Sequence, residues 1–391
     1  MAIESIALNI NTTDVQAMYF ALQQKLNAGW IVKELIAIAL PLLVFFTGWG
    51  AWIYNWLVQR LRKWATAAFV FFFAIALITL IAQFAILYYL ITMKAGVDGS
   101  PVPSFAAFLL AKAPEAVVIS SLAALIGILL CYILNRRSRL AWLWLSVLIT
   151  AVASGALMAV PALTPTEPLG DTPVERAIAE MAGRVGIPVS SIAKEPCGDS
   201  DCPPGHVIGL GPSRLLLLDD RLTDRTPQDQ LLEVFAHEAK HYLLDNNFKP
   251  PMLIFSICAA LFFVTQSLSS VVLARQRRQY AVLSDHAAAI PLVFGLGLAA
   301  FMLLQPAITT FRVHLEFEAD RFGLELDRNN QALIDIMRTY AAANPMLYRH
   351  TAVTRYFRAT HPEIRARIRF AETYRPWLND EPMVYAQYFR E

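Results

Sequence analysis

The sequence predicts a mainly α-helical protein, a polytopic membrane helical bundle of about six spans joined to a smaller soluble part. Of the 391 residues, 56% are hydrophobic, and the mean hydropathy is +0.45. Only 16% are Asp, Glu, Lys or Arg, whereas a soluble globular domain carries about 25%. Several apolar stretches exceed the roughly 20 residues that a helix needs to cross a bilayer. These observations argue against a disordered chain and against a wholly soluble enzyme.

The long apolar stretches form three pairs along the chain. Within each pair, a short polar loop separates the two stretches, as expected for helices that cross a membrane and return. The predicted spans cover Leu35–Val58, Ala65–Thr92, Ala116–Leu134, Leu140–Pro161, Met252–Ala274 and Ala287–Phe311.

The start of the chain does not resemble a secretory signal peptide. It mixes Glu4, Asp14 and Lys25 with apolar residues, and it lacks a basic start and an uninterrupted apolar core. We expect it to form an amphipathic segment on the membrane surface, with the first apolar stretch retained as an anchor.

The spans divide the chain into five predicted regions. Within the soluble part, Thr172–Val185 and Asp229–Leu244 have the apolar spacing and early prolines of helices. Leu215–Leu218 is typical of a buried strand, and His206–Gly211 of a neighbouring or edge strand. The regions are an amphipathic segment (1–30), a four-span bundle (31–161), a soluble insert (162–250), two further spans (251–311) and a C-terminal helical region (312–391).

Charge is nearly balanced overall but uneven between loops. With 33 basic and 31 acidic residues, the chain lacks the basic excess of a nucleic-acid-binding protein. Cytoplasmic loops of membrane proteins are enriched in Lys and Arg, and three loops on one face share this enrichment. We therefore expect a bacterial inner-membrane protein with its soluble insert and C-terminal region outside the cytoplasm. The loop residues are Arg60, Arg62 and Lys63, then Arg136, Arg137 and Arg139, then Arg275, Arg277 and Arg278.

Residues 237–241 have the sequence His-Glu-Ala-Lys-His. Positions four apart on a helix share a face, so His237 and His241 can both bind one Zn²⁺, and Glu238 can act as general base on a water activated by the metal. The alternative is a surface helix with two solvated histidines. The apolar neighbours Leu231 and Phe235 argue against it, because they predict a buried helix in which these polar side chains need partners.

A catalytic zinc needs three protein ligands and an open position. Glu316 and Asp320 are again four residues apart. Glu316 is a candidate for the third ligand, and Asp320 for a hydrogen bond to the second ring nitrogen of a zinc histidine. From spacing alone, Glu318 and His314 remain alternative ligands. The acidic residues of this segment are also compatible with an ordinary helix that leaves a membrane and binds no metal.

Cys197 and Cys202 lie in a short polar stretch. A disulfide between them would persist in an oxidising compartment, in agreement with a soluble insert outside the cytoplasm. Two unlinked thiols are an equal alternative. A zinc knuckle is disfavoured because no second Cys/His pair lies nearby.

In these motifs the chain resembles the membrane-embedded gluzincins, that is, the type I CaaX prenyl proteases and their bacterial relatives, including the heat-shock membrane metalloproteases. The resemblance extends from about Pro165 to Phe370 and implies a zincin-type metallopeptidase domain containing a small β-sheet. Leu315–Asp320 matches the family's E-x-x-x-D segment, which favours Glu316 over Glu318.

The resemblance also adds residues that spacing alone does not single out. Thr360–Ile368 matches the family's late His-Pro segment, which implies that His361 and Arg367 lie near the developing oxyanion. Without the resemblance, His361 could equally be a helix-capping residue and Arg367 a solvated charge on a helix. The segment before Arg214–Asp219 resembles the family's edge strand, which pairs with an extended substrate. The residues of that strand are His206, Val207, Ile208, Gly209, Leu210 and Gly211.

The chain departs from the family in two respects. Pro204 and Gly205 stand where the family usually has Asn-Ala. The prenyl proteases have seven spans, one more than the chain is predicted to have. A missing span reverses the orientation, which agrees with the arginine-rich loops and opposes the family's cytosolic active site.

We therefore expect an integral-membrane zinc endopeptidase that holds one Zn²⁺ through His237, His241 and Glu316 and cleaves membrane-associated proteins or peptides. The alternative is a non-proteolytic membrane scaffold or chaperone with a structural zinc site, although such sites are usually closed by four Cys or His ligands. A transporter would need ionisable residues within its spans, which hold almost none. The sequence gives no indication of oligomeric state.

Overall fold

The computed structural model describes residues 13–135, 139–197, 203–221, 226–246, 249–275 and 289–390. The chain divides into two compact units. One unit combines Leu148–Ser256 with Pro306–Glu391 and includes the N-terminal residues up to Phe20. The other combines Ala21–Val147 with Ile257–Gln305.

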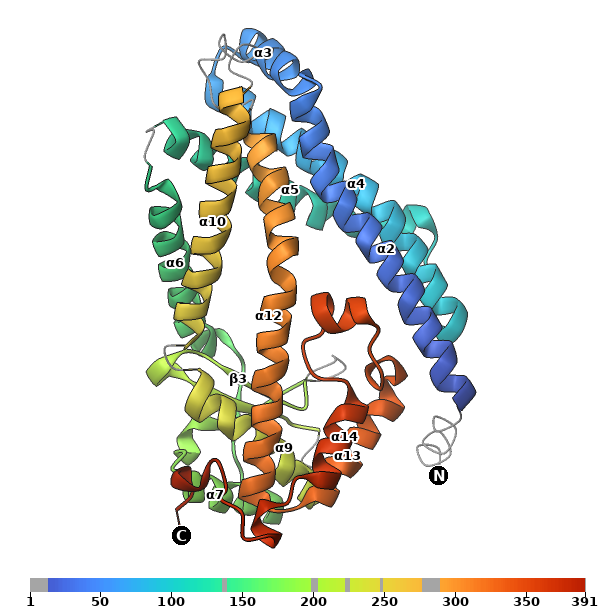
Figure 1. Ribbon diagram of the computed structural model, residues 1–391, viewed down its shortest axis with the longest axis vertical. Helices are drawn as coiled ribbons and strands as arrows, with labels where there is room; N and C mark the ends of the chain where they lie inside the picture. Colours follow the sequence, from blue (N-terminus) through green and yellow to red (C-terminus); the bar gives the residue numbers. More distant parts are fainter. Residues whose placement is uncertain are drawn as a thin grey trace. The chain divides into compact units, whose positions relative to one another are not determined.

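In the described residues, six helices are long and apolar enough to cross a membrane (Figure 1). This confirms the predicted fold class of a mainly α, polytopic membrane bundle, and the number of spans agrees with the prediction. These helices are α2 (Thr13–Phe46), α4 (Trp64–Asp98), α5 (Phe105–Asn135), α6 (Ala141–Leu163), α10 (Lys249–Arg275) and α12 (Ile290–Asp327).

The first span lies earlier in the chain than predicted. Instead of one helix over Leu35–Val58, the structure has α2 ending at Phe46 and a separate helix, α3 (Trp49–Leu61). Gly48 between them has a φ of 75°, a left-handed conformation that glycine adopts readily and that ends helices. From Thr13 onward, the predicted amphipathic segment is therefore the beginning of α2 rather than an element of its own.

The soluble part contains a small mixed sheet with the strand order β1-β2-β4-β3. The central strand β4 is buried because three of its leucines, Leu216 to Leu218, have no exposed surface. It pairs in parallel with β2 and antiparallel with β3, which lies at the edge of the sheet. The strands are β1 (Glu167–Pro168), β2 (Ile192–Glu195), β3 (Gly205–Ile208) and β4 (Leu215–Asp219).

The edge strand is shorter than the predicted stretch His206–Gly211. β3 ends at Ile208, and Gly209 and Gly211 have φ values of 85° and 58°. Positive φ is incompatible with continuing a strand, so residues 209–211 turn the chain toward β4. His206, Val207 and Ile208 are therefore in the strand, whereas Gly209, Leu210 and Gly211 form the turn that follows it.

Helices α7 (Pro173–Val185), α9 (Gln228–Lys240), α13 (Asn330–Ala343) and α14 (Ile364–Thr373) complete the soluble part. The side chain of Thr172 caps α7 by accepting a hydrogen bond from the Glu175 backbone N–H, and Glu175 reciprocates. The predicted helix Asp229–Leu244 is α9 followed by a wider π-helical turn, His241–Asp245. The core of this part contains the fully buried Leu231, Phe235 and Phe322, so α9 and the second half of α12 belong to one packed body.

Candidate metal centre

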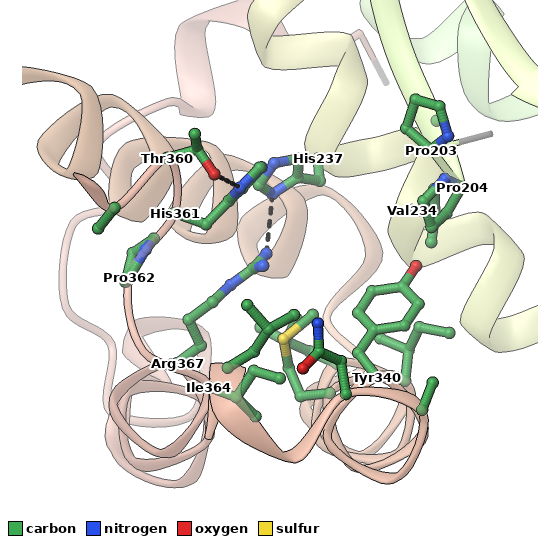
Figure 2. A pocket seen from close by; sticks show the side chains of 18 of the residues that line it. Pro203, Pro204, Val234, His237, Tyr340, Thr360, His361, Pro362, Ile364 and Arg367 are labelled. Carbon is green, nitrogen blue, oxygen red and sulfur yellow. Dashed lines mark hydrogen bonds between the residues drawn. The ribbon is translucent and has the colours of Figure 1, made fainter. Parts of the chain in front are cut away.

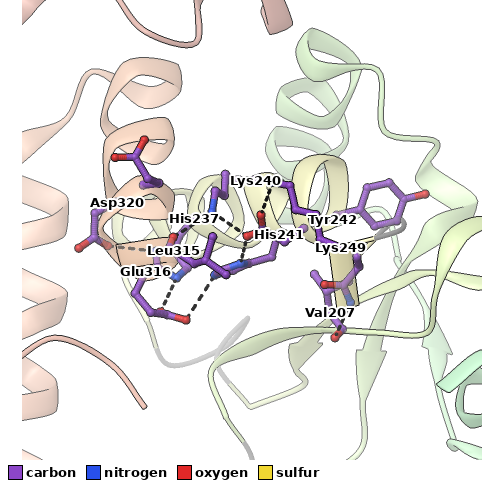
Figure 3. Close-up of polar contacts among 12 residues, drawn as sticks. Val207, His237, Lys240, His241, Tyr242, Lys249, Leu315, Glu316 and Asp320 are labelled. Atoms are coloured by element: carbon purple, nitrogen blue, oxygen red, sulfur yellow. Dashed lines mark hydrogen bonds and ion pairs between the residues drawn. The ribbon is translucent and has the colours of Figure 1, made fainter. Parts of the chain in front are cut away.

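Two histidines of α9 and its following turn face a glutamate of α12 (Figure 3). The ring centroids of His237 and His241 are 5.1 Å apart. Glu316 lies between them, with Oε2 3.4 Å from His237 Nε2 and Oε1 3.6 Å from His241 Nε2. The four-residue spacing thus brings together both histidines, and the second half of α12 supplies the carboxylate.

The arrangement fits a zinc ion. One ligand atom from each of His237, His241 and Glu316 lies within 4.8 Å of the others. Two atoms bound tetrahedrally to zinc at about 2.1 Å lie roughly 3.4 Å apart, which is close to the spacing of these nitrogens and oxygens. The buried Glu316 Oε2 has no hydrogen-bond partner among the described residues. A divalent cation would satisfy this oxygen and balance the negative charge.

The rival third ligands lie elsewhere. Glu318 Oε1 accepts a hydrogen bond from Arg321 at 2.5 Å, and its Oε2 accepts one from the Tyr385 hydroxyl at 2.6 Å. His314 is exposed on α12. Of the three candidates, Glu316 has the carboxylate that lies beside both histidines.

Each histidine has its second ring nitrogen beside a carboxylate. His237 Nδ1 lies 3.0 Å from Asp320 Oδ1, and His241 Nδ1 lies 2.8 Å from Asp245 Oδ2. Such contacts orient the ring so that Nε2 points toward a metal. The sequence analysis anticipated the contact of Asp320 but assigned no role to Asp245. The signal was available, since Asp245 follows His241 by the same four-residue helical spacing.

Arg367 of α14 is buried behind His237. Its Nε donates to Asp320 Oδ2 at 2.8 Å, and its Nη2 donates to Oδ1 at 2.5 Å. Burial alone would lower the pKa of Arg367, but the Asp320 carboxylate holds this pKa above its usual range. The sequence analysis placed Arg367 near the oxyanion, whereas its contacts here are with the carboxylate that supports a metal-ligand candidate.

His361 and Glu238 lie on the accessible side of the centre. His361 Nε2 is 3.3 Å from Glu316 Oε2, and His361 Nδ1 is 2.9 Å from the Thr360 hydroxyl. Glu238 is half-buried and lines a cavity together with His237 and His361; Figure 2 shows these two histidines at one end of that cavity. Glu238 and His361 are therefore placed where they could contact a substrate.

Electrostatics at the centre are dominated by carboxylates. Burial alone would lower the pKa of His237, but Asp320 and Glu316 raise it to about 10. Burial alone would raise the pKa of Asp245, but His241 and Lys240 lower it to about 2. The carboxylates therefore favour the positive form of His237, whereas the neighbours of Asp245 favour its negative form.

A buried lysine joins the two helices of the centre. Lys240 has almost no exposed surface; its Nζ donates to Asp245 Oδ2 at 2.6 Å and to the Leu315 backbone carbonyl at 2.9 Å. Burial lowers its pKa, and the Asp245 carboxylate opposes this. The contact with Leu315 ties the end of α9 to the turn of α12 that precedes Glu316. Sequence reasoning missed this residue because nothing in its local pattern marks a buried lysine.

Glu233 lies one helical turn before His237 and is also buried. Among the described residues, neither of its carboxylate oxygens has a hydrogen-bond partner. It faces Gly323 of α12, where an added Cβ would lie 2.8 Å from Glu233 Oε1. Burial, with the nearby Asp327 and Asp320, raises the pKa of Glu233 well above 4.5.

The structure describes only one of the two cysteines in the polar stretch Cys197–Cys202. Cys197 is buried at the end of the segment that follows β2, whereas Cys202 lies outside the described residues. Cys197 is disulfide-bonded, and its pairing with Cys202 stays a prediction.

Lys240 and Lys249 contact the same carboxylate from different environments, so they form a matched pair. Lys240→Met should destabilise the protein by about 3–5 kcal/mol, because it removes one partner of a buried ion pair. Lys249 Nζ is 3.0 Å from Asp245 Oδ1, but its side chain is 56% exposed. Lys249→Met should therefore cost less than about 1 kcal/mol. Thermal unfolding of both variants checks this; equal losses would contradict the structural role of Lys240.

Glu233→Gln should stabilise the protein, and more at pH 8 than at pH 5. As pH rises above 4.5, the unfolded chain releases the Glu233 proton while the native state retains it, so wild type loses stability. Gln cannot ionise and escapes this loss. Melting temperatures at both pH values measure the effect, with Glu180→Gln on the exposed face of α7 as the control. A gain that does not grow with pH would contradict a neutral buried carboxyl.

Comparison with known proteins agrees with the geometry. Residues 168–375 match the model of peptidase family M48. An uncharacterized metalloprotease, YhfN, of Bacillus subtilis (strain 168) is 25% identical over 211 residues, which are 52% of this chain and 49% of the relative. A CAAX prenyl protease 1 homolog of Dictyostelium discoideum is 26% identical over 211 residues, 50% of this chain and 48% of the relative. The matched region spans about half the length of these curated relatives.

Similarity in three-dimensional structure extends beyond residues 168–375. The crystal structure of S. mikatae Ste24p superposes with a TM-score of 0.54 at 16% identity, covering 88% of this chain and 99% of that one. The predicted resemblance to the CaaX prenyl proteases is confirmed. M48 peptidases are in general zinc-dependent, in agreement with the donor set of the centre. Six of the described helices are long and apolar enough to cross a membrane, and the match over more than half of its length shows that the chain belongs to peptidase family M48.

Proposed function

We propose that the protein is a zinc-dependent endopeptidase of the gluzincin type, with one Zn²⁺ held by His237, His241 and Glu316. The observation that supports this most strongly is the contact of Glu316 with the Nε2 atoms of both histidines, while each Nδ1 lies beside a carboxylate. This arrangement provides three protein ligands, and structural zinc sites are instead closed by four. A catalytic role is therefore favoured over a scaffold with a structural zinc.

In this proposal, a few side chains each have a separate role in peptide hydrolysis. A bound Zn²⁺ would polarise the scissile carbonyl and lower the pKa of the attacking water. Glu238 takes the proton from that water and delivers it to the leaving amine. His361 is placed to donate a hydrogen bond to the oxyanion. Arg367 acts indirectly, because its bidentate contact with Asp320 holds the carboxylate that orients His237.

The substrate binds as an extended strand along the edge strand β3. Gly205 at the start of β3 packs directly on the catalytic helix, since an added Cβ would lie 3.0 Å from both Glu238 Cγ and Val234 Cγ1. A peptide paired with β3 therefore passes beside Glu238. Given the membrane spans, the substrates are membrane-associated proteins or peptides.

The basic loops support an orientation with the peptidase part outside the cytoplasm of a bacterial inner membrane. Arg60, Arg62 and Lys63 are exposed between the first two spans, and arginines recur between the third and fourth and between the fifth and sixth. Prenylation is cytosolic chemistry, so this orientation disfavours prenylated substrates, although one relative is named a CAAX prenyl protease homolog.

Glu238→Gln should keep zinc and lose activity. We expect about one Zn²⁺ per chain by elemental analysis in both proteins, with kcat for peptide cleavage reduced 10²–10⁴-fold in the variant, because only the proton acceptor is removed. His237→Ala should lose both zinc and cleavage. Zinc in wild type without cleavage of any peptide would instead support the scaffold, and unchanged cleavage by Glu238→Gln would refute the role of Glu238.

The orientation can be measured with a reporter fused at the C-terminus. Alkaline phosphatase, which is active only outside the cytoplasm, should be active after Glu391, and a green fluorescent protein that matures only in the cytoplasm should remain dark. The opposite pattern would place the peptidase part in the cytoplasm.

A further inference from the structure

A short helix, α3, links the first two spans (Figure 1). Its 13 residues extend about 20 Å at 1.5 Å per residue, whereas the hydrocarbon core of a bilayer is about 30 Å thick. Gly48 before it and Arg62 after it have left-handed backbone conformations, with φ values of 75° and 57°. α3 is therefore too short to cross a membrane, and a turn separates it from the span on either side.

One face of α3 packs against its own compact unit. Gly50, Tyr54 and Leu57 are buried, and the centroid of the Tyr54 ring lies 5.7 Å from that of Phe71 on α4. Ile290, at the start of α12, belongs to the same hydrophobic cluster. This packing determines which face of α3 points away from the protein.

The outward face of α3 carries a row of tryptophans. Trp49, Trp52 and Trp56 have the three- and four-residue spacing of one helix face, and they are 68%, 70% and 50% exposed. Trp64, the first residue of α4, is also exposed. On α5, by contrast, the exposed large apolar residues between positions 117 and 129 are Val, Leu and Ile. Because the amphipathic ring of tryptophan is enriched where a membrane meets water, this face is suited to the interface rather than to the hydrocarbon core.

Basic residues follow the tryptophans. Arg60, Arg62 and Lys63 are exposed, and the guanidinium carbon of Arg60 lies 5.8 Å from the centroid of the Trp56 ring. Residues 35–97 contain no Asp or Glu, so the neighbouring sequence supplies no carboxylate to neutralise these charges. The end of α3 therefore presents aromatic rings and positive charge side by side.

We propose that α3 lies in the membrane interface and that its basic end binds the phosphate of an anionic phospholipid headgroup, such as that of phosphatidylglycerol. Helices that lie in this plane combine an apolar, aromatic face with Lys and Arg. Guanidinium groups form charge-assisted hydrogen bonds with phosphate oxygens, and an anionic leaflet attracts basic residues beside a span.

A lipid fits this surface better than a protein partner does. A protein that covered the tryptophans would also have to supply carboxylates to Arg60, Arg62 and Lys63, whereas an anionic phospholipid carries both acyl chains and the negative charge. The site belongs to the unit that contains most of the spans, and it is independent of the proposed peptide cleavage.

Native mass spectrometry of the full-length protein, delipidated in a neutral detergent, tests the headgroup site. The probes are phosphatidylglycerol and phosphatidylcholine with the same acyl chains. We expect the Kd of phosphatidylglycerol to be at least about 10-fold lower, because each basic residue near an anionic lipid favours binding by about fivefold. The triple variant Arg60→Gln, Arg62→Gln, Lys63→Gln should lose this preference.

A matched control removes the same number of charges from exposed positions of the peptidase part. Arg176→Gln, Arg338→Gln and Arg369→Gln, on α7, α13 and α14, together should leave the preference unchanged. Thermal unfolding in the same detergent checks that both triple variants retain the fold. Equal Kd values for the two lipids in wild type, or the same loss of preference in both triple variants, would overturn the headgroup site.

Tryptophan fluorescence tests the position of α3 without removing a charge. The variant Trp49→Phe, Trp52→Phe, Trp56→Phe keeps aromatic rings on this face, and its emission subtracted from that of wild type isolates the three tryptophans. In nanodiscs containing phosphatidylglycerol, lipids brominated near the headgroup end of the acyl chain should quench this difference more strongly than lipids brominated near the methyl end.

Three other quenching results would each overturn the interfacial position. Stronger quenching from the methyl end would place α3 in the hydrocarbon core. Quenching by aqueous acrylamide alone would place it in water. Quenching by neither lipid nor acrylamide would mean that a protein, such as a second copy of the chain, covers the tryptophans.

Discussion

The soluble part depends on a contact between α9 and α12 that is made through charged groups. His237, Asp320 and Arg367 form one buried chain of contacts, and Lys240 joins Asp245 to the backbone of α12. Burying such charges is costly unless each is matched in place. A cation bound beside Glu316 would add a further charge to this interface, and the stability of the protein would then be coupled to metal binding.

Much of this centre was predictable because its members obey helix periodicity. His237 and His241, and likewise Glu316 and Asp320, are neighbours on their helix surfaces by spacing alone. The contact between Arg367 and Asp320 joins residues 47 apart and results from the packing of α14 against α12, which no local pattern encodes. Only the family resemblance drew attention to Arg367, and it gave no indication of the contact with Asp320.

The misplaced boundaries have a common physical origin. Hydropathy identifies apolar stretches but does not detect the left-handed glycine at position 48, which ends α2 inside one of them. The same conformation at Gly209 ends β3 early. Gly205 shows the opposite case, in which glycine is needed for close packing against Glu238 rather than for its dihedral angles. The departure from the family's Asn-Ala thus lies where the edge strand packs closely against α9.

The dispersal of the centre along the chain has a consequence for biosynthesis. His237 and Arg367 are separated by 130 residues, and Glu316 is made between them. At about 5–20 residues per second, a ribosome needs roughly 6 to 26 seconds to pass from the first histidine to the arginine. During this interval the nascent chain contains the proposed general base and two proposed zinc ligands, but it still lacks Arg367. A chain truncated before α14 therefore lacks the contact of Arg367 with Asp320, and the proposed site is complete only after α14 has been made.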